Sequence, residues 1–292
     1  IPDEIREREM GYIEEGIEQH ILSIKQELTG NTDPYLLNSK IEHSRWSLNV
    51  DRVDRWVDYL ESGQVTKELF FQEILPIIGV KRDNDGLLTL YHATPFHNLI
   101  SILKDQSIDP VEKHGRDAYG LINYSDVDNK LNENQYKKIY LANNKHATEF
   151  ADRIRGTIGQ PIYIIQVKVN PDNLSIDEDF TKDQRDNAWA YELALSGSCS
   201  HYGSIDNFKL VGKLNRDKPS LAEDPYWDVD INEVIKWSQD AVGSEEEKER
   251  IKRHWQGQYV TENEEVKSLR SFGIDYDSLQ HIEGNTEMVS EY

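Results

Sequence analysis

Cysteine is the scarcest residue of this 292-residue chain, which contains only Cys199. A single thiol excludes an intrachain disulfide and any metal centre built from several cysteines. Long apolar runs are also missing, because no stretch approaches 18 consecutive apolar residues, and we therefore predict no membrane partner. The chain begins with IPDE and no apolar leader. We interpret it as a processed piece that folds in the cytoplasm of a producing or target cell.

Several motifs of common enzyme classes are absent as well. The sequence has no GxGxxG and no phosphate-binding loop, which argues against a dinucleotide-binding dehydrogenase or a kinase. The nine histidines do not fall into HExxH or another paired spacing of metal ligands, so we expect no metal site.

Acidic side chains exceed basic ones and give the chain a formal net charge of −21. The excess is uneven: residues 88–215 hold 14 basic and 17 acidic side chains, and the flanks carry most of the negative charge. A strongly acidic protein repels phosphate backbones at long range, which lowers the expectation of a nucleic-acid partner. A simpler interpretation is that the negative charge only keeps the protein soluble.

Residues 1–80 are predicted to form a helical N-terminal region. Isoleucines recur at three- and four-residue steps over the first thirty residues, which indicates one amphipathic helix ending at Gly30. Shorter helices are expected at 34–46, 50–60 and 66–78. The polar, turn-rich stretch 81–86 (KRDNDG) is predicted to be a domain boundary.

The segment 87–215 changes to short β-runs alternating with helices, and we predict that it is one domain. Two long polar connections, 105–137 and 170–190, interrupt it. From about Asp228 the chain is expected to return to helices as a C-terminal region, 228–292, in which Ser244 and Glu247 form a capping box. Strands are expected at 87–92, 138–142, 161–169 and 208–214, and helices at 96–104 and 145–155.

Three short signatures in the central segment carry the candidate chemistry. The first is LYHAT, a strand that ends in His92 and Thr94 and precedes an apolar helix. The second is IYLA with Tyr140, and the third is Glu192, which precedes the strand 208–214. The first two have purely structural alternatives: His92 as a satisfied strand-end histidine, and Tyr140 as a core tyrosine.

The central segment resembles the ADP-ribosyltransferase superfamily in the order and spacing of its motifs. These motifs are LYHAT, NLISIL, IYLA, HATEFA and IYIIQV, followed by a late glutamate. The similarity is to the superfamily's His-Tyr-Glu branch, which includes diphtheria-toxin-like and poly-ADP-ribose-polymerase-like enzymes, and it covers roughly 127 residues. It implies an α+β fold, with a split β-sheet core like that of the ADP-ribosyltransferases, between N-terminal and C-terminal helical regions.

The resemblance also implies roles for individual residues, with NAD as the substrate. Glu192 would be the catalytic carboxylate that stabilises an oxocarbenium-like ribose. His92 would bond the adenosine ribose, Thr94 would support the same strand end, and the backbone of Ala93 would hold the nicotinamide amide. Tyr140 would stack on the nicotinamide ring.

The sequence departs from familiar subfamilies of these enzymes. Arginine-modifying and Rho-modifying toxins carry Gln or Glu two residues before the catalytic glutamate, where this chain has Ala190. The neighbouring Tyr191 is a candidate contact to the target. In the segment 110–137, Arg116 and Tyr119 are candidate contacts to NAD, with exposed loop residues as the alternative. Rivals for the glutamate role are Glu178, Asp179 and Asp206.

The sequence therefore favours a mono-ADP-ribosyltransferase that modifies a macromolecule, more readily a protein than a nucleic acid. A bacterial or phage toxin or effector is one setting for it, and an inhibitor or antitoxin is a candidate partner of the helical flanks. The alternatives are a nucleic-acid-modifying ADP-ribosyltransferase, an NAD glycohydrolase, an RNA 2′-phosphotransferase and an inactive NAD-binding interaction module. The absence of an arginine beside His92 in the sequence argues against the phosphotransferase.

Overall fold

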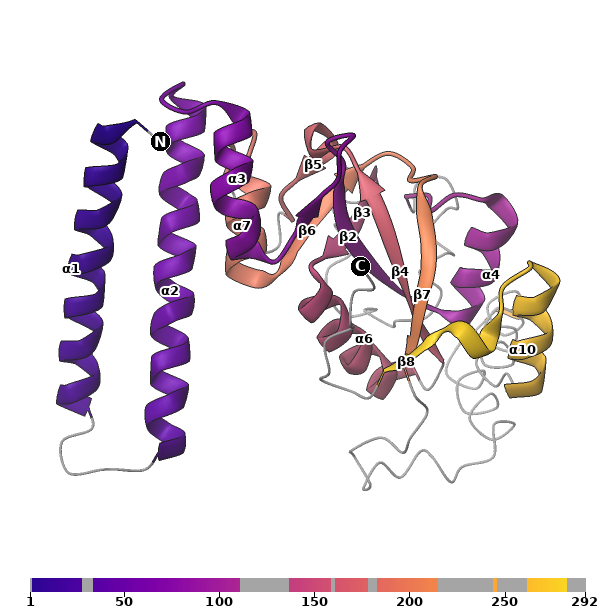
Figure 1. Cartoon of the computed structure of the whole chain (residues 1–292). Helices are drawn as coiled ribbons and strands as arrows, with labels where there is room; N and C mark the ends of the chain where they lie inside the picture. Colours follow the sequence, from indigo (N-terminus) through magenta and orange to yellow (C-terminus); the bar gives the residue numbers. More distant parts are fainter. Residues whose placement is uncertain are drawn as a thin grey trace. The chain divides into compact units, whose positions relative to one another are not determined.

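The computed structural model of the chain contains two compact units (Figure 1). The structure describes residues 2–27, 34–110, 137–158, 161–177, 183–214, 244–245 and 262–282. Unit 1 comprises Ile1–Lys81 and Ser175–Cys199, and unit 2 comprises Arg82–Leu174 and Ser200–Tyr292. The expected helix after Asp228, the partner Glu247 of the predicted capping box, and residues 111–136 of the first long connection lie outside the described residues.

Unit 1 is mainly helical in its described part, and its N-terminal segment is helical as expected. It contains α1 (Asp3–Glu27), α2 (Pro34–Glu61), α3 (Lys67–Ile78) and α7 (Ala188–Ser196). The expectation of separate helices at 34–46 and 50–60 is wrong, because α2 is continuous from Pro34 to Glu61. The intervening Ser47, Leu48 and Asn49 include neither Gly nor Pro, so nothing there breaks the helix.

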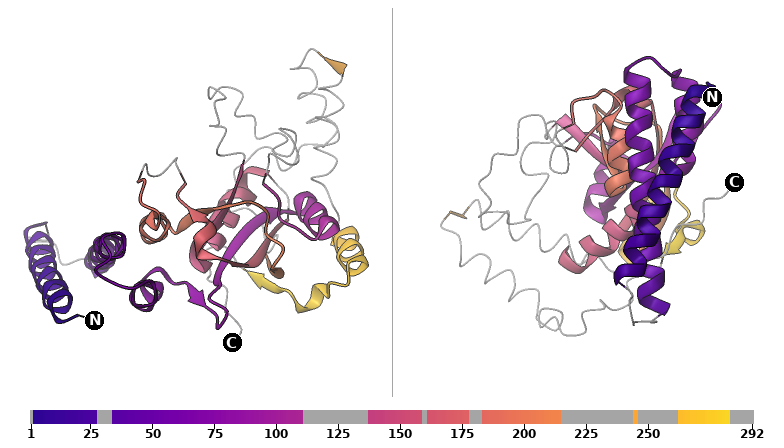
Figure 2. Two further views of the ribbon diagram at one scale, coloured as in Figure 1. Left: turned by 90° about the horizontal axis from the view of Figure 1, so that it is seen from above. Right: turned by 90° about the vertical axis from the view of Figure 1, so that its left-hand side faces the viewer.

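Buried polar bonds join the two long helices of unit 1, which lie side by side (Figures 1 and 2). The Glu9 carboxylate of α1 is buried and accepts hydrogen bonds from Arg55 Nε at 2.9 Å and from Tyr59 Oη at 3.1 Å. A buried carboxylate needs such partners to offset its lost hydration. These bonds therefore specify how α1 meets α2.

Unit 2 contains most of a mixed β-sheet, which includes the four strands expected from the sequence within a few residues at each end. In the described residues the strand order is β5-β6-β3-β2-β4-β7-β8, and β1 pairs with β2. Helices α4 (Phe96–Asp105) and α6 (Asn144–Ile158) follow β2 and β3. The strands are β1 (Lys81–Arg82), β2 (Leu88–Pro95), β3 (Lys138–Ala142), β4 (Ile162–Val169), β5 (Leu174–Ser175), β6 (Ser198–Tyr202), β7 (Phe208–Leu214) and β8 (Gln280–Ile282).

Helices cover both faces of this sheet, which explains why the first half of β4 is buried on both sides. On one face, Ile162 and Ile164 pack against Ala147 and Ala151 of α6. On the other face, the ring of Tyr163 lies 6.0 Å from that of Phe96 at the start of α4. Successive strand residues point to opposite faces, so a strand buried on both sides has a nearly continuous apolar sequence.

The end of the described chain adds a strand to the sheet, where the sequence predicted helices. Helix α10 (Glu262–Ser271) is followed by the short helix η4 (Tyr276–Ser278) and by β8, which runs parallel to β7. Within unit 2, Glu265 of α10 is fully buried and lies 3.4 Å from the Lys213 ammonium of β7. None of the described helices combines the length and the apolar character that a membrane crossing needs.

Candidate functional site

The candidate site begins where β2 separates from β3. Every residue of β2 has a partner in β4. Between β2 and β3, the described residues show one pair of partners, Tyr91 and Ala142. His92, Ala93 and Thr94 follow Tyr91 directly. The first predicted signature therefore lies at the divergence of two neighbouring strands.

His92 bridges this divergence. Its half-buried ring places Nδ1 3.0 Å from the carbonyl oxygen of Tyr140 in β3. Burial lowers the pKa of His92, with the bond to Tyr140 opposing the shift, so the ring is neutral at pH 7. Because a carbonyl only accepts hydrogen bonds, Nδ1 carries the proton and donates it, which leaves Nε2 as an acceptor.

The two residues after His92 occupy different environments. The side chain of Ala93 packs beside the cluster that α6 forms with the sheet, and its backbone lies opposite Ile164 of β4. Thr94 is only 1% exposed and lies opposite Tyr163. The supporting role of Thr94 and the contact of the Ala93 backbone with NAD both stay predictions.

Tyr140 is half-buried in β3, two residues before Ala142. Ala142 packs against the α6 cluster, so alternation along the strand places the Tyr140 side chain on that same face. His92, next to Tyr91 of that cluster, lies on the other face of β2. The structure thus brings the His92 ring to the backbone of Tyr140, and the two side chains leave their strands on opposite sides.

Glu192 lies in α7, a helix that the sequence analysis did not predict. Its side chain is fully buried, and its Oε2 accepts a hydrogen bond from the backbone N–H of Asp177 at 2.6 Å. Burial, and then the charges of Glu192 and Asp177, raise the pKa of the nearby Cys199 thiol well above its usual value. Cys199 is therefore a protonated, buried thiol and a poor nucleophile.

The predicted set is divided between the two units. His92, Ala93, Thr94 and Tyr140 belong to unit 2, whereas Glu192 belongs to unit 1. Among the alternatives weighed from the sequence, Asp206 is exposed between β6 and β7. Four other candidates lie outside the described residues: Arg116, Tyr119, Glu178 and Asp179.

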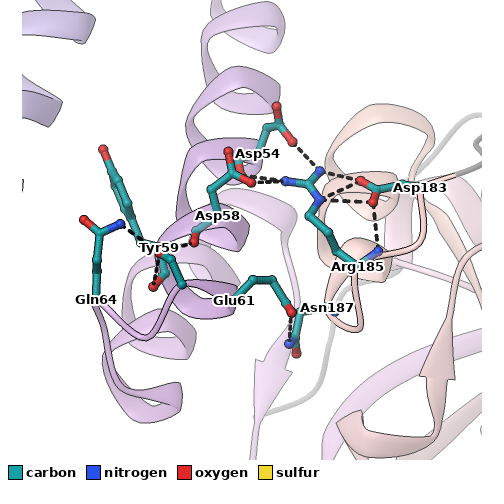
Figure 3. Close-up of polar contacts among 9 residues, drawn as sticks. Asp54, Asp58, Tyr59, Glu61, Gln64, Asp183, Arg185 and Asn187 are labelled. Atoms are coloured by element: carbon teal, nitrogen blue, oxygen red, sulfur yellow. Dashed lines mark hydrogen bonds and ion pairs between the residues drawn. The ribbon is translucent and has the colours of Figure 1, made fainter.

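Two arrangements close to the predicted residues were not expected. On β6, the buried His201 places its Nδ1 3.2 Å from the Gly203 carbonyl, and burial lowers its pKa. Just before α7, Arg185 binds three carboxylates at once (Figure 3). Two of these, Asp54 and Asp58, lie more than 120 residues away in sequence, so no local signal predicts this contact.

The described residues contain no group of three or more His, Cys, Asp or Glu side chains arranged to hold a metal ion. Comparisons with protein-family models, with curated proteins and with solved structures gave no match.

Proposed function

We propose that this chain is a mono-ADP-ribosyltransferase, with an ADP-ribosyltransferase-like split-sheet core, that moves ADP-ribose from NAD to a macromolecular acceptor. The observation that carries the proposal is the junction of His92 with the Tyr140 carbonyl, where β2 and β3 diverge. It brings the His92 ring to the backbone of Tyr140, whose side chain leaves its strand on the opposite side. In the neutral ring of His92, Nε2 is a hydrogen-bond acceptor, and a ribose hydroxyl is a suitable donor for it.

The residues have complementary roles in the proposed reaction. The bond between nicotinamide and ribose C1′ breaks, its electron pair leaves with nicotinamide, and the acceptor's nucleophile bonds to C1′ and loses its proton. His92 Nε2 accepts a hydrogen bond from ribose. Stacking of the Tyr140 ring on the cationic nicotinamide ring is assigned from the family resemblance alone, because this ring lies on the opposite side of the strands from His92. The Glu192 carboxylate stabilises the positive charge that develops on ribose.

A second candidate function is an NAD-binding module that does not turn NAD over. The observation that favours it is the burial of Glu192, whose carboxylate has no exposed surface and bonds the Asp177 backbone. In the proposed enzyme that carboxylate must reach the ribose. Binding of NAD without its consumption by purified protein supports the second candidate, and nicotinamide release excludes it.

The acceptor is proposed to be a protein rather than a nucleic acid. A chain with a net charge of −21 has little long-range attraction for phosphate backbones. Incubation with labelled NAD and a cell lysate, followed by separate protease and nuclease digestion, tests this choice. Loss of label to protease alone is the expected result, and loss to nuclease alone identifies a nucleic-acid acceptor. NAD hydrolysis without labelled macromolecules identifies a glycohydrolase.

A further inference from the structure

Arg185 of unit 1 is bound by carboxylates on three sides (Figure 3). Its Nη2 lies 2.6 Å from Asp54 Oδ1, its Nη1 2.7 Å from Asp58 Oδ1, and its Nε 2.9 Å from Asp183 Oδ2. Asp183 also contacts Nη2, so it engages both nitrogens of one edge of the guanidinium group. Charge-assisted bonds of this forked geometry are among the strongest and most orienting in proteins. We call these four residues the Arg185 clamp.

The α2 side of the clamp is a row of acidic residues on one helix face. Asp54 and Asp58 are four residues apart, so both project toward Arg185, which offsets their mutual repulsion. One turn further along, Glu61 Oε1 accepts bonds from the Asn187 backbone N–H at 3.2 Å and from Nδ2 at 2.7 Å. Residues 183–187 are thereby fastened along the last two turns of α2.

These fastened residues lead directly into α7. The Ala188 N–H donates to the Arg185 carbonyl at 3.1 Å, and Asn187 is the residue that precedes the helix. Within the same unit, the buried Trp189 of α7 lies 6.4 Å from the ring of Phe71 in α3. Apolar packing holds the body of α7, but apolar contacts are non-directional. The directed bonds of the clamp fix where the helix begins.

We propose that Arg185 is a positioning residue for Glu192: the clamp sets the start of α7 on α2 and so determines where the buried carboxylate lies. Glu192 is four residues after Ala188, about one helical turn into α7, so a shift at the start moves the carboxylate with it. The inference rests on the proposed function for its effect on turnover. It also assigns the N-terminal helices a part in the reaction, as the support of the glutamate helix.

The proposal predicts a specific kinetic signature for Arg185→Gln. kcat for nicotinamide release falls on the order of 10- to 100-fold, because small misplacements of a catalytic group have effects of that size. KM for NAD changes by less than about twofold, because the proposed NAD contacts of His92 and Tyr140 belong to unit 2. Arg185→Lys keeps the positive charge but loses the planar group that binds carboxylates through two nitrogens, so its kcat is expected to lie between those of Arg185→Gln and wild type.

Arg52→Gln is the matched control. Arg52 is also on α2 and also partly buried, and it forms a 2.7 Å ion pair with Glu73 of α3, away from the clamp. The control therefore loses a single arginine ion pair of the same unit without touching residues 183–187, and its kcat is expected to stay within about twofold of wild type. Asp54→Asn, which weakens the clamp from the α2 side, covers the case in which Arg185→Gln fails to fold.

The single cysteine provides a second readout that needs no NAD. Cys199 is fully buried in unit 1 close to Glu192, so a thiol reagent such as DTNB reports how often the surroundings of α7 open. The labelling rate at fixed pH is expected to rise at least tenfold in Arg185→Gln and in Asp54→Asn, and to stay unchanged in Arg52→Gln.

The two readouts separate failure of the positioning role from failure of the proposed function. A wild-type protein that releases no nicotinamide contradicts the proposed function, and the positioning role in turnover falls with it, whatever the labelling shows. If wild-type protein turns NAD over, an Arg185→Gln variant with wild-type kcat and wild-type Cys199 labelling overturns the positioning role alone. A fall in kcat in the Arg52→Gln control equal to that in Arg185→Gln also overturns it, because the effect is then general destabilisation.

Discussion

His92 donates a hydrogen bond from Nδ1 to the Tyr140 carbonyl. Nδ1 therefore orients the ring, and Nε2 is the nitrogen that is proposed to accept a bond from NAD. In His92→Asn, the amide nitrogen takes the place of Nδ1 and keeps that bond, while the acceptor Nε2 is lost. We expect NAD affinity to fall about tenfold, the effect of one hydrogen bond of about 1.4 kcal/mol. His201→Asn is the matched control, since His201 also bonds a carbonyl through Nδ1. Calorimetric titration with NAD measures both, and equal affinities of the two variants would remove His92 from the site.

The same two histidines predict how stability responds to acid. Burial lowers the pKa of His92 and of His201 in the folded protein, so the unfolded chain binds protons more readily. Their contribution is complete above the unfolded value of about 6.5 and is lost as the pH falls below it. Between pH 7 and pH 5 the free energy of unfolding should therefore fall less in the His92→Asn/His201→Asn double variant than in wild type. Parallel curves from denaturant titrations would contradict the lowered pKa values.

At this scale, the sequence predicted which strands carry the candidate side chains but not the partners of those side chains. His92 and Tyr140 were identified because alternating apolar residues mark their strands, and both lie in the expected strands. The contact between the His92 ring and a backbone carbonyl 48 residues away has no sequence signal. The partners of Arg185 on α2 were likewise unpredictable, because side-chain contacts between distant segments depend on how helices pack.

At the scale of elements, a buried ion pair connects α10 to β7. Lys213 and Glu265 are almost inaccessible to solvent, and the hydroxyls of Tyr276 and Tyr163 bond to them. Lys213→Met removes the cation beside a buried carboxylate, which we expect to cost about 3–5 kcal/mol of unfolding free energy. Chemical denaturation of Lys213→Met, Glu265→Leu and the double variant measures the coupling. The double variant should regain much of the loss, and additive losses would contradict an energetic link between the two side chains.

Elements with strong local patterns were predicted well, and elements defined by distant pairing were not. Strand β4 has a long apolar run, and α6 has an apolar stripe, so both were expected within a few residues. Helix α7 was missed because Glu192 was placed by its position before the last strand, although Ala and Leu around it favour a helix. The three residues of β8 are too few for a period-2 signal, and their parallel pairing with β7 is non-local.

At the scale of the whole molecule, the net charge of −21 predicts weak binding to nucleic acids. We expect the dissociation constant for a 20-nucleotide single strand or duplex to be weaker than about 100 μM at physiological salt, because even non-specific binders fall near 1–100 μM there. Fluorescence anisotropy of a labelled oligonucleotide measures it. Micromolar binding that weakens with salt would reveal a basic surface hidden by the net charge, and would favour a nucleic-acid acceptor.

The residues of the proposed reaction are divided between the two units of the chain. The proposed NAD contacts belong to unit 2, whereas Glu192 and its Arg185 clamp belong to unit 1, whose two segments are separated in sequence by most of unit 2's strands. The sequence suggested one contiguous catalytic domain, 87–215. Residues 175–199 of that range instead group with the N-terminal helices in unit 1. The mixture of helices and strands agrees with the predicted α+β class, and the catalytic assignment stays a prediction.

The most direct test is the release of nicotinamide from NAD by the purified chain, with and without lysate, followed by chromatography. The account predicts measurable turnover in wild type and a loss on the order of 100-fold or more in Glu192→Ala, the effect of removing one transition-state stabiliser. Circular dichroism of the variant verifies that it is folded. No nicotinamide release by wild type, or equal release by a folded Glu192→Ala protein, would contradict the account.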